Sequence, residues 1–137
     1  MIVAIFVIVL LAALGALVTS MSGKIVKTSS AQYLREQSIL LGQSYTGYAV
    51  MALTANEQNT SGCLNDITGS YGKYKVDVKL SYIDGAQING NCRKFGSGSI
   101  LSAETPKNVI VDVFVRYPDP DQGDHNITYH RRTLQKI

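Results

Sequence analysis

The sequence predicts an α+β fold in which one long N-terminal α-helix packs on a small antiparallel β-sheet. Three observations support this prediction. Residues 1–23 hold no charged residue and no proline, residues 24–55 repeat apolar side chains at helical spacing, and two later stretches alternate apolar and polar side chains. We therefore divide the chain into an apolar half-helix (1–23), an amphipathic half of the same helix (24–55) and a globular β-sheet head (56–137).

The apolar segment, residues 1–23, is long enough to cross a membrane. At about 1.5 Å per residue, a helix over this segment is roughly 33 Å long. Its apolar residues lie on every side of the helix, so that it needs apolar surroundings all round. A cleavable signal peptide would begin with a basic region, which is absent here, and the rest of the chain could hardly bury such a helix as a core element. The abrupt apolar start suggests that a basic leader has already been removed.

Residues 24–55 are predicted to continue this helix and to place one face against the head. Apolar and aromatic side chains recur at steps of three, four or seven residues, whereas Lys24, Lys27 and Arg35 fall largely elsewhere. Glycine weakens a helix by about 1 kcal/mol relative to alanine. Gly42 and Gly47 are therefore either weak points or places where the sheet packs closely. The residues expected at the helix-to-sheet seam are Tyr33, Leu34, Leu41, Tyr45 and Tyr48.

The head is predicted to be a small antiparallel sheet. Residues 71–84 alternate apolar and polar side chains, which predicts a half-buried strand that ends at the Asp84-Gly85 turn. The other predicted elements are a loop over residues 56–70, a second loop over residues 87–98, a strand over Val109–Arg116, a tight turn with the sequence YPDPDQGD, and a less regular strand over Ile127–Gln135.

Two cysteines and a small net charge limit the compartment and the partners. Together with the apolar anchor, Cys63 and Cys92 predict a disulfide in an oxidising compartment outside the cytoplasm, with two free buried thiols as the alternative. Closing such a loop stabilises a protein by roughly 3–4 kcal/mol in the chain-entropy model. The net charge of +3 gives no strong electrostatic reason to expect nucleic acid as a partner.

The sequence contains no catalytic constellation, and we expect neither an enzyme nor a cofactor. No metal-ligand spacing of cysteine and histidine occurs, and the weak calcium candidate, Asp119, Asp121 and Asp124, does not have EF-hand spacing. Asn59 and Asn126 each begin an N-glycosylation sequon and have an acidic residue two positions earlier, as in the longer acceptor sequence of bacterial oligosaccharyltransferases. Both asparagines are therefore candidate glycosylation sites.

These features resemble a type IV pilin or a related pseudopilin. The stretch AIFVIVLLAALGALV is similar to minor pilins of the mannose-sensitive-haemagglutinin type. The resemblance covers the whole chain in architecture, but in sequence character only the N-terminal helix. In this family a peptidase removes a short basic leader, the apolar half-helices pack as the core of a helical filament, and the heads form its outside. The resemblance implies that Cys63 and Cys92 correspond to the disulfide that pins a loop in many pilin heads.

The sequence departs from the family pattern at two positions. Most major pilins carry a glutamate at the fifth mature position, where Ile5 stands, and a proline near position 22, where Ser22 stands. The missing acid is more typical of certain minor or tip subunits. The physical case for assembly remains, because an apolar helix can move from lipid into a helix bundle at little hydrophobic cost. The small residues that would allow close approach are Ala12, Ala13, Gly15 and Ala16.

The resemblance implies a structural subunit of a type IV pilus-like filament that polymerises through its apolar helix. The expected partners are further copies of the chain in a helical homopolymer, the membrane before assembly, the prepilin peptidase, and the pilus or secretion assembly machinery. The expected location is the inner membrane before assembly and then an extracellular surface filament. Two alternatives stay open: a minor pseudopilin of a secretion or pilus-initiating complex, and a monomeric membrane-anchored periplasmic binding domain. The expected filament-core residues are Ile5, Phe6, Leu10, Ala13, Leu14, Gly15 and Leu17.

Overall fold

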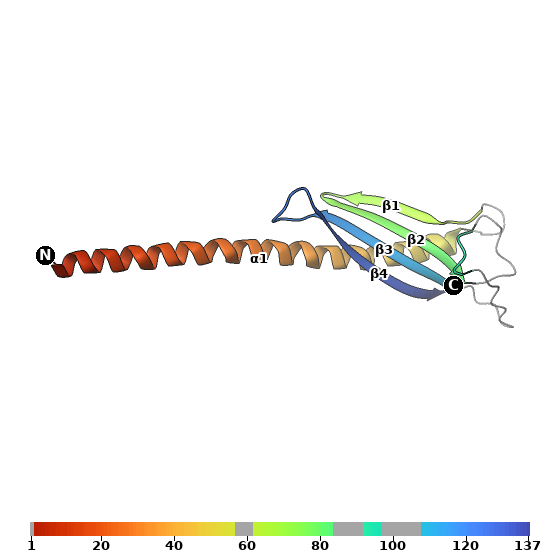
Figure 1. Cartoon of the computed structure of the whole chain (residues 1–137). Helices are drawn as coiled ribbons and strands as arrows, with labels where there is room; N and C mark the ends of the chain where they lie inside the picture. The colour runs from red at the N-terminus through yellow and green to blue at the C-terminus, as the bar shows by residue number, and fades with distance from the viewer. Residues whose placement is uncertain (1, 57–61, 84–91, 97–107) are drawn as a thin grey trace.

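The chain forms one helix and one sheet. A computed structural model describes residues 2–56, 62–83, 92–96 and 108–137 (Figure 1). The strands form a single antiparallel sheet in the order β1-β2-β3-β4, in which each strand pairs with the next along the chain. This architecture confirms the predicted α+β fold. The elements are α1 (Ile2–Ala55), β1 (Asp66–Tyr71), β2 (Tyr74–Ile83), β3 (Asn108–Pro118) and β4 (Asn126–Lys136).

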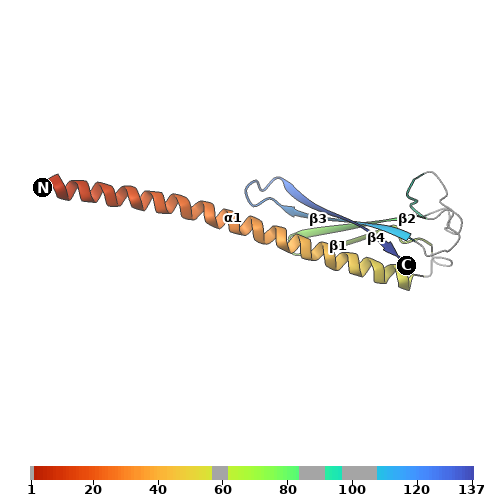
Figure 2. The same cartoon turned by 90° about the horizontal axis from the view of Figure 1, so that it is seen from below.

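Helix α1 extends far beyond the sheet. Its 54 residues form one continuous helix, which is about 80 Å long at 1.5 Å per residue. Figures 1 and 2 show the sheet lying along the C-terminal half of α1, whereas the N-terminal half projects away from the head. Burial follows the same division, since every residue from Ile2 to Ser30 is exposed and Ala31 is the first half-buried residue.

The hydrophobic core lies between the sheet and the C-terminal half of α1. Alternate side chains of β2 are buried, which indicates that one face of this strand packs against the helix, whereas β3 is buried on both faces from Val109 to Val113. The register places Val78 opposite Val113 and Leu80 opposite Val111, so that β-branched and leucine side chains pair across the two central strands. Leu53 of α1 completes this core from the helix side.

Strand β1 occupies part of the stretch that was predicted to be a loop. Its sequence is short and mostly polar, and Gly69 lowers its strand propensity further. The structure gives a reason for this glycine, because a Cβ there would collide with the Tyr45 ring of α1. The predicted strand over residues 71–84 is also divided, since Gly72 (φ +56°) begins a hairpin turn between β1 and β2. The predicted turn at Asp84-Gly85 lies outside the described residues.

The seam between α1 and the sheet uses smaller side chains than predicted. Leu34, Leu41 and Tyr45 are half-buried against the core, but Tyr33 and Tyr48 are 62% and 54% exposed and do not belong to the seam. The spacing of large apolar residues places the buried face of α1 about one residue away from its true centre. Small side chains contribute little to this spacing, although they form most of the buried face. The buried residues of α1 are Ser38, Gly42, Thr46, Ala49 and Leu53.

Candidate functional site

The N-terminal half of α1 exposes a continuous apolar surface. Its large apolar side chains are exposed on every side, from Ile2 (81% exposed) to Val26 (69% exposed). Within the described part of the chain, α1 is the one helix that is long and apolar enough to span a membrane. Soluble monomers rarely expose contiguous apolar patches larger than a few hundred Å². This surface therefore requires lipid or other protein chains around it.

The residues predicted to form a filament core all lie on this surface. A Cβ added to Gly15 would meet no atom within 4 Å, so nothing in the same chain competes for the space beside that residue. None of these side chains takes part in folding of the head, which leaves all of them available to an external partner. The predicted core residues Ile5, Phe6, Leu10, Ala13, Leu14, Gly15 and Leu17 are all exposed.

Positive charge begins where the apolar surface ends. Lys24, Lys27 and Arg35 are exposed, and no acidic residue precedes Glu36 in the sequence. None of the three cations forms an ion pair with another residue that the structure describes. We call residues 24–35 the basic neck. It joins the apolar half of α1 to the part that the sheet covers, and the sheet begins beside Leu34 at its end.

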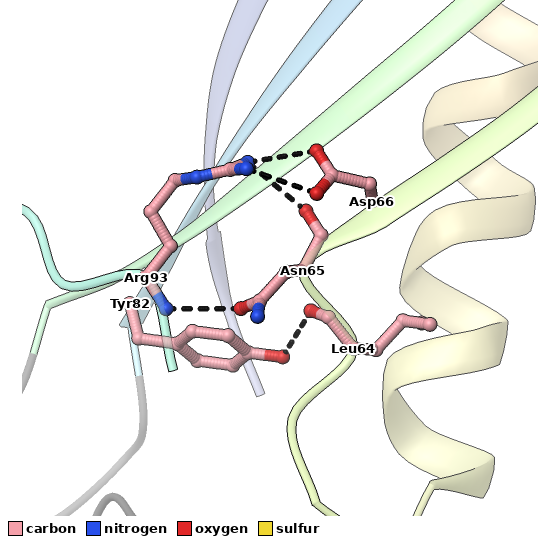
Figure 3. A network of polar contacts seen from close by, with 5 residues as sticks. All are labelled: Leu64, Asn65, Asp66, Tyr82 and Arg93. Carbon is pink, nitrogen blue, oxygen red and sulfur yellow. Dashed lines mark hydrogen bonds and ion pairs between the residues drawn. The ribbon is translucent and has the colours of Figure 1, made fainter. Parts of the chain in front are cut away.

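The end of the head farthest from the basic neck is fastened by a disulfide and an adjoining ion pair. Cys63 and Cys92 form the predicted disulfide, with their Cα atoms 5.1 Å apart. The Arg93 guanidinium donates to both carboxylate oxygens of Asp66 at 2.9 Å, and the Arg93 backbone N–H donates to Asn65 Oδ1 at 2.9 Å (Figure 3). The hydrogen bond to the Asp66 carboxylate raises the pKa of Arg93 above its usual value.

Tyr82 connects this fastening to the sheet. Its hydroxyl donates a hydrogen bond to the Leu64 carbonyl at 2.7 Å (Figure 3). Its backbone N–H donates to the Arg93 carbonyl at 2.8 Å, and its own carbonyl accepts from the Phe95 N–H at 2.9 Å. Burial of Tyr82 raises the pKa of its hydroxyl above the usual value. These bonds attach residues 92–96, the segment that contains Cys92, to Tyr82 near the end of β2. Strand β1 does not reach this part of β2, because its first residue, Asp66, pairs with Lys79.

A carboxylate is buried on the sheet face that points away from α1. Asp112 is 6% exposed, because Arg132 donates to its two oxygens at 2.7 and 3.0 Å and His130 Nε2 lies 2.8 Å from Oδ1. Burial raises the pKa of Asp112, but hydrogen bonds and charges from Arg132 and His130 lower it more, so that its pKa lies below the usual 3.8. Phe114 stacks on His130 with ring centroids 4.4 Å apart. This cluster ties β3 to β4, and sequence reasoning missed it because the strand register was unknown.

The calcium candidate lies in the loop between β3 and β4. Asp119 Oδ1 accepts a hydrogen bond from the Asp121 N–H at 2.9 Å, and the Asp119 N–H donates to the His125 carbonyl at 2.8 Å. Across the described residues, no group of three or more His, Cys, Asp or Glu side chains could hold a metal ion. Asp119, Asp121 and Asp124 therefore belong to an acidic turn, and the structure does not gather them into a ligand set.

The two candidate glycosylation sites differ in what the structure describes. Asn59 lies outside the described residues. Asn126 is exposed and is the first residue of β4, opposite Pro118 of β3. The strand predicted over Ile127–Gln135 therefore begins one residue earlier, at this asparagine. Surface exposure is the condition for attaching a glycan, and attachment itself stays a prediction.

Comparisons with known proteins do not place the chain in a family. No family model matches it, and neither a curated protein nor a solved structure is significantly similar to it. What the chain does must therefore be inferred from its own residues and their geometry.

Proposed function

We propose that this chain is a structural subunit of a type IV pilus-like extracellular filament. The N-terminal halves of α1 would pack together as the filament core, and the sheet heads would form the outside. One observation carries the proposal: every residue from Ile2 to Ser30 is exposed, although residues 2–18 contain no polar side chain. The head packs on the other half of α1 alone, so that the apolar half remains free for neighbouring copies (Figure 1).

The energetics favour assembly from a membrane. Burying one large apolar side chain contributes about 1.5–3 kcal/mol, so that the half-helix does not remain in water. Lipid and a helix bundle are comparably apolar, and close packing therefore decides between them. Small residues let helices approach each other closely, and α1 has four of them in one turn and a half. These residues are Ala12, Ala13, Gly15 and Ala16.

The disulfide supports an orientation of the subunit in the membrane, whereas the lysines fit either a cytoplasmic flank or an interfacial anchor. A disulfide between Cys63 and Cys92 fits a head that folds in an oxidising compartment outside the cytoplasm. Lys24 and Lys27 would then lie at the lipid headgroups between the membrane and the head, where cationic side chains are common anchors. Before assembly the subunit would span the inner membrane with its head on the outer side, where the filament forms.

A membrane-anchored monomer is the second candidate. The observation in its favour is that α1 alone is long and apolar enough to cross a bilayer. A minor pseudopilin that initiates assembly is the related alternative, and Ile5 favours it because most major pilins have an acid at the fifth mature position. All three candidates share the membrane-spanning state, and they differ in whether the chain leaves it in large numbers.

The test is to shear surface material from cells that produce the chain and to examine it by electron cryo-microscopy. We expect filaments with the apolar half of α1 at the axis. Gly15→Leu keeps the helix apolar enough for membrane insertion but fills the space for close approach, so that filaments should disappear while the membrane level stays normal. The matched control, Gly47→Leu, makes the same change outside the apolar half of α1, where an added Cβ meets no atom within 4 Å, and should leave filaments intact. A chain that remains in membranes and is absent from the filament body would refute the proposal.

A further inference from the structure

The loop between β3 and β4, residues 119–125, is the acidic counterpart of the basic neck. It contains Asp119, Asp121 and Asp124 and no lysine or arginine. Asp121 and Asp124 are exposed, and none of the three aspartates forms an ion pair within the described part of the chain. Figures 1 and 2 place this loop, drawn in dark blue, at the end of the sheet nearer the apolar half of α1.

The conformation of this acidic loop is fixed by its own backbone. The Asp119 N–H donates to the His125 carbonyl at 2.8 Å, and the His125 N–H donates to the Gln122 carbonyl at 2.9 Å. The Asp121 N–H donates to Asp119 Oδ1 at 2.9 Å. An ordered loop presents its charges without a further entropy cost, which favours binding to a complementary surface.

The basic neck has the matching properties on a helix face that the head leaves uncovered. Lys24 and Lys27 are unpaired cations, and the residues between them, Ile25 and Val26, are 67% and 69% exposed. Lys24 and Lys27 are three positions apart and therefore neighbour each other on the helix surface, whereas Ile25 and Val26 point to other sides. Two unpaired cations on one exposed face are complementary to a protein surface of negative charge. The acidic loop has that charge.

We propose that, in the filament, the acidic loop of one copy docks on the basic neck of a neighbouring copy. This inference rests on the proposed filament and adds the contact that sets the stagger between its subunits. The sheet begins beside Leu34, whose carbonyl accepts a hydrogen bond from the Tyr74 hydroxyl at 3.3 Å. Lys27 and Lys24 lie about 10 and 15 Å from Leu34 along the helix, at 1.5 Å per residue. Figure 1 shows that the acidic loop reaches farther along α1 toward the basic neck than the β1–β2 hairpin does, so that a neighbouring copy packed beside the chain can bring its lysines to the loop.

The experiment is zero-length cross-linking of sheared filaments with a water-soluble carbodiimide, which joins a carboxylate to a lysine amine as an amide. We expect dimers and larger species on a denaturing gel, and mass spectrometry should find peptides that join Lys24 or Lys27 to an aspartate of residues 119–125. The same chain dispersed in detergent at low concentration should give no such links.

A charge-reversal pair sharpens the test. Asp121→Lys with Asp124→Lys leaves only the half-buried Asp119 in the loop and should remove the links to the two exposed aspartates, and adding Lys24→Asp with Lys27→Asp in the same chain should restore links in the reversed direction. Filaments that form without neck-to-loop links would overturn this inference alone. Links that persist in dispersed monomers would show that the contact lies within one chain and would overturn it as well. A chain that forms no filaments overturns the proposed function and this inference together.

Discussion

Replacing Gly42 by alanine tests how closely α1 approaches the sheet. In the interior of a helix, replacing glycine by alanine ordinarily stabilises by about 1 kcal/mol. A Cβ on Gly42 would lie 2.8 Å from Tyr129 Cε1, 3.4 Å from Tyr129 Cδ1 and 3.9 Å from Val115 Cγ2. A Cβ on Gly47, one and a half turns further along, would meet nothing within 4 Å. The same chemical change is therefore made once against the sheet and once in open space.

The expected magnitudes follow from two opposing terms. Overpacking costs about 1–3 kcal/mol, because the Tyr129 ring or the helix must shift, and the helix propensity of alanine returns about 1 kcal/mol. Gly42→Ala should therefore lie between neutral and about 2 kcal/mol less stable than the wild type. Gly47→Ala should be about 1 kcal/mol more stable. The difference between the two variants isolates the contact with Tyr129, because the propensity term cancels.

Urea unfolding of the full chain in detergent provides the assay, followed by near-ultraviolet circular dichroism of the tyrosines. The chain has 8 tyrosines and no tryptophan, so that the signal comes mainly from the head and the seam. Gly42→Ala in a Tyr129→Ala background should stabilise, because the obstructing ring is gone. If Gly42→Ala stabilises the wild-type chain as much as Gly47→Ala does, the close approach of α1 and β4 is wrong.

Two further predictions concern the fastenings of the head, both measured by chemical unfolding of the full chain. Asp112→Asn should lower the free energy of unfolding by about 1–3 kcal/mol at neutral pH, because the amide carries no charge and its NH2 group replaces the oxygen that accepts the second hydrogen bond from Arg132. The pKa of Asp112 is lowered below 3.8 in the folded state, so the wild type should be more stable than the variant by the full difference above pH 3.8. This difference in the free energy of unfolding should disappear as the pH falls through the lowered pKa. A difference that does not depend on pH would contradict the prediction. Cys63→Ser with Cys92→Ser should cost about 3 kcal/mol while the membrane level of the chain stays normal, and an unchanged unfolding midpoint would contradict the stabilising role of the disulfide.

Local patterns made most of the fold predictable. The apolar run and the helical spacing after it predicted a helix over residues 1–55, and α1 is Ile2–Ala55. Alternation of valines predicted β3, because each side chain reports directly on the face it occupies. Strand β1 was missed since its glycine serves a contact with Tyr45, which lies on another element. Contacts between elements can outweigh the low strand propensity of a short polar sequence, and they cannot be predicted from that sequence alone.

The polar clusters of the head were not predictable for a different reason. Asp112 and Arg132 face each other only because the register pairs these two positions, which are 20 residues apart in the sequence. A one-residue slip would place one of them on the helix side of the sheet. The apolar half of α1, by contrast, could be recognised from composition alone, since its exposure on every side depends on no register.

An apolar core specifies association better than it specifies register. Each large apolar side chain of the N-terminal half finds a similar environment after a shift of one helical turn, so that hydrophobic contact alone discriminates weakly between staggers. The chain has no acidic residue before Glu36 that could fix the register from within the core. Polar discrimination must therefore come from outside it, and the basic neck is the nearest set of unpaired charges to the apolar half. Ion pairs at such a surface are individually weak and are screened by salt, whereas the apolar core is not. High ionic strength should consequently loosen the stagger between subunits before it dissolves the filament.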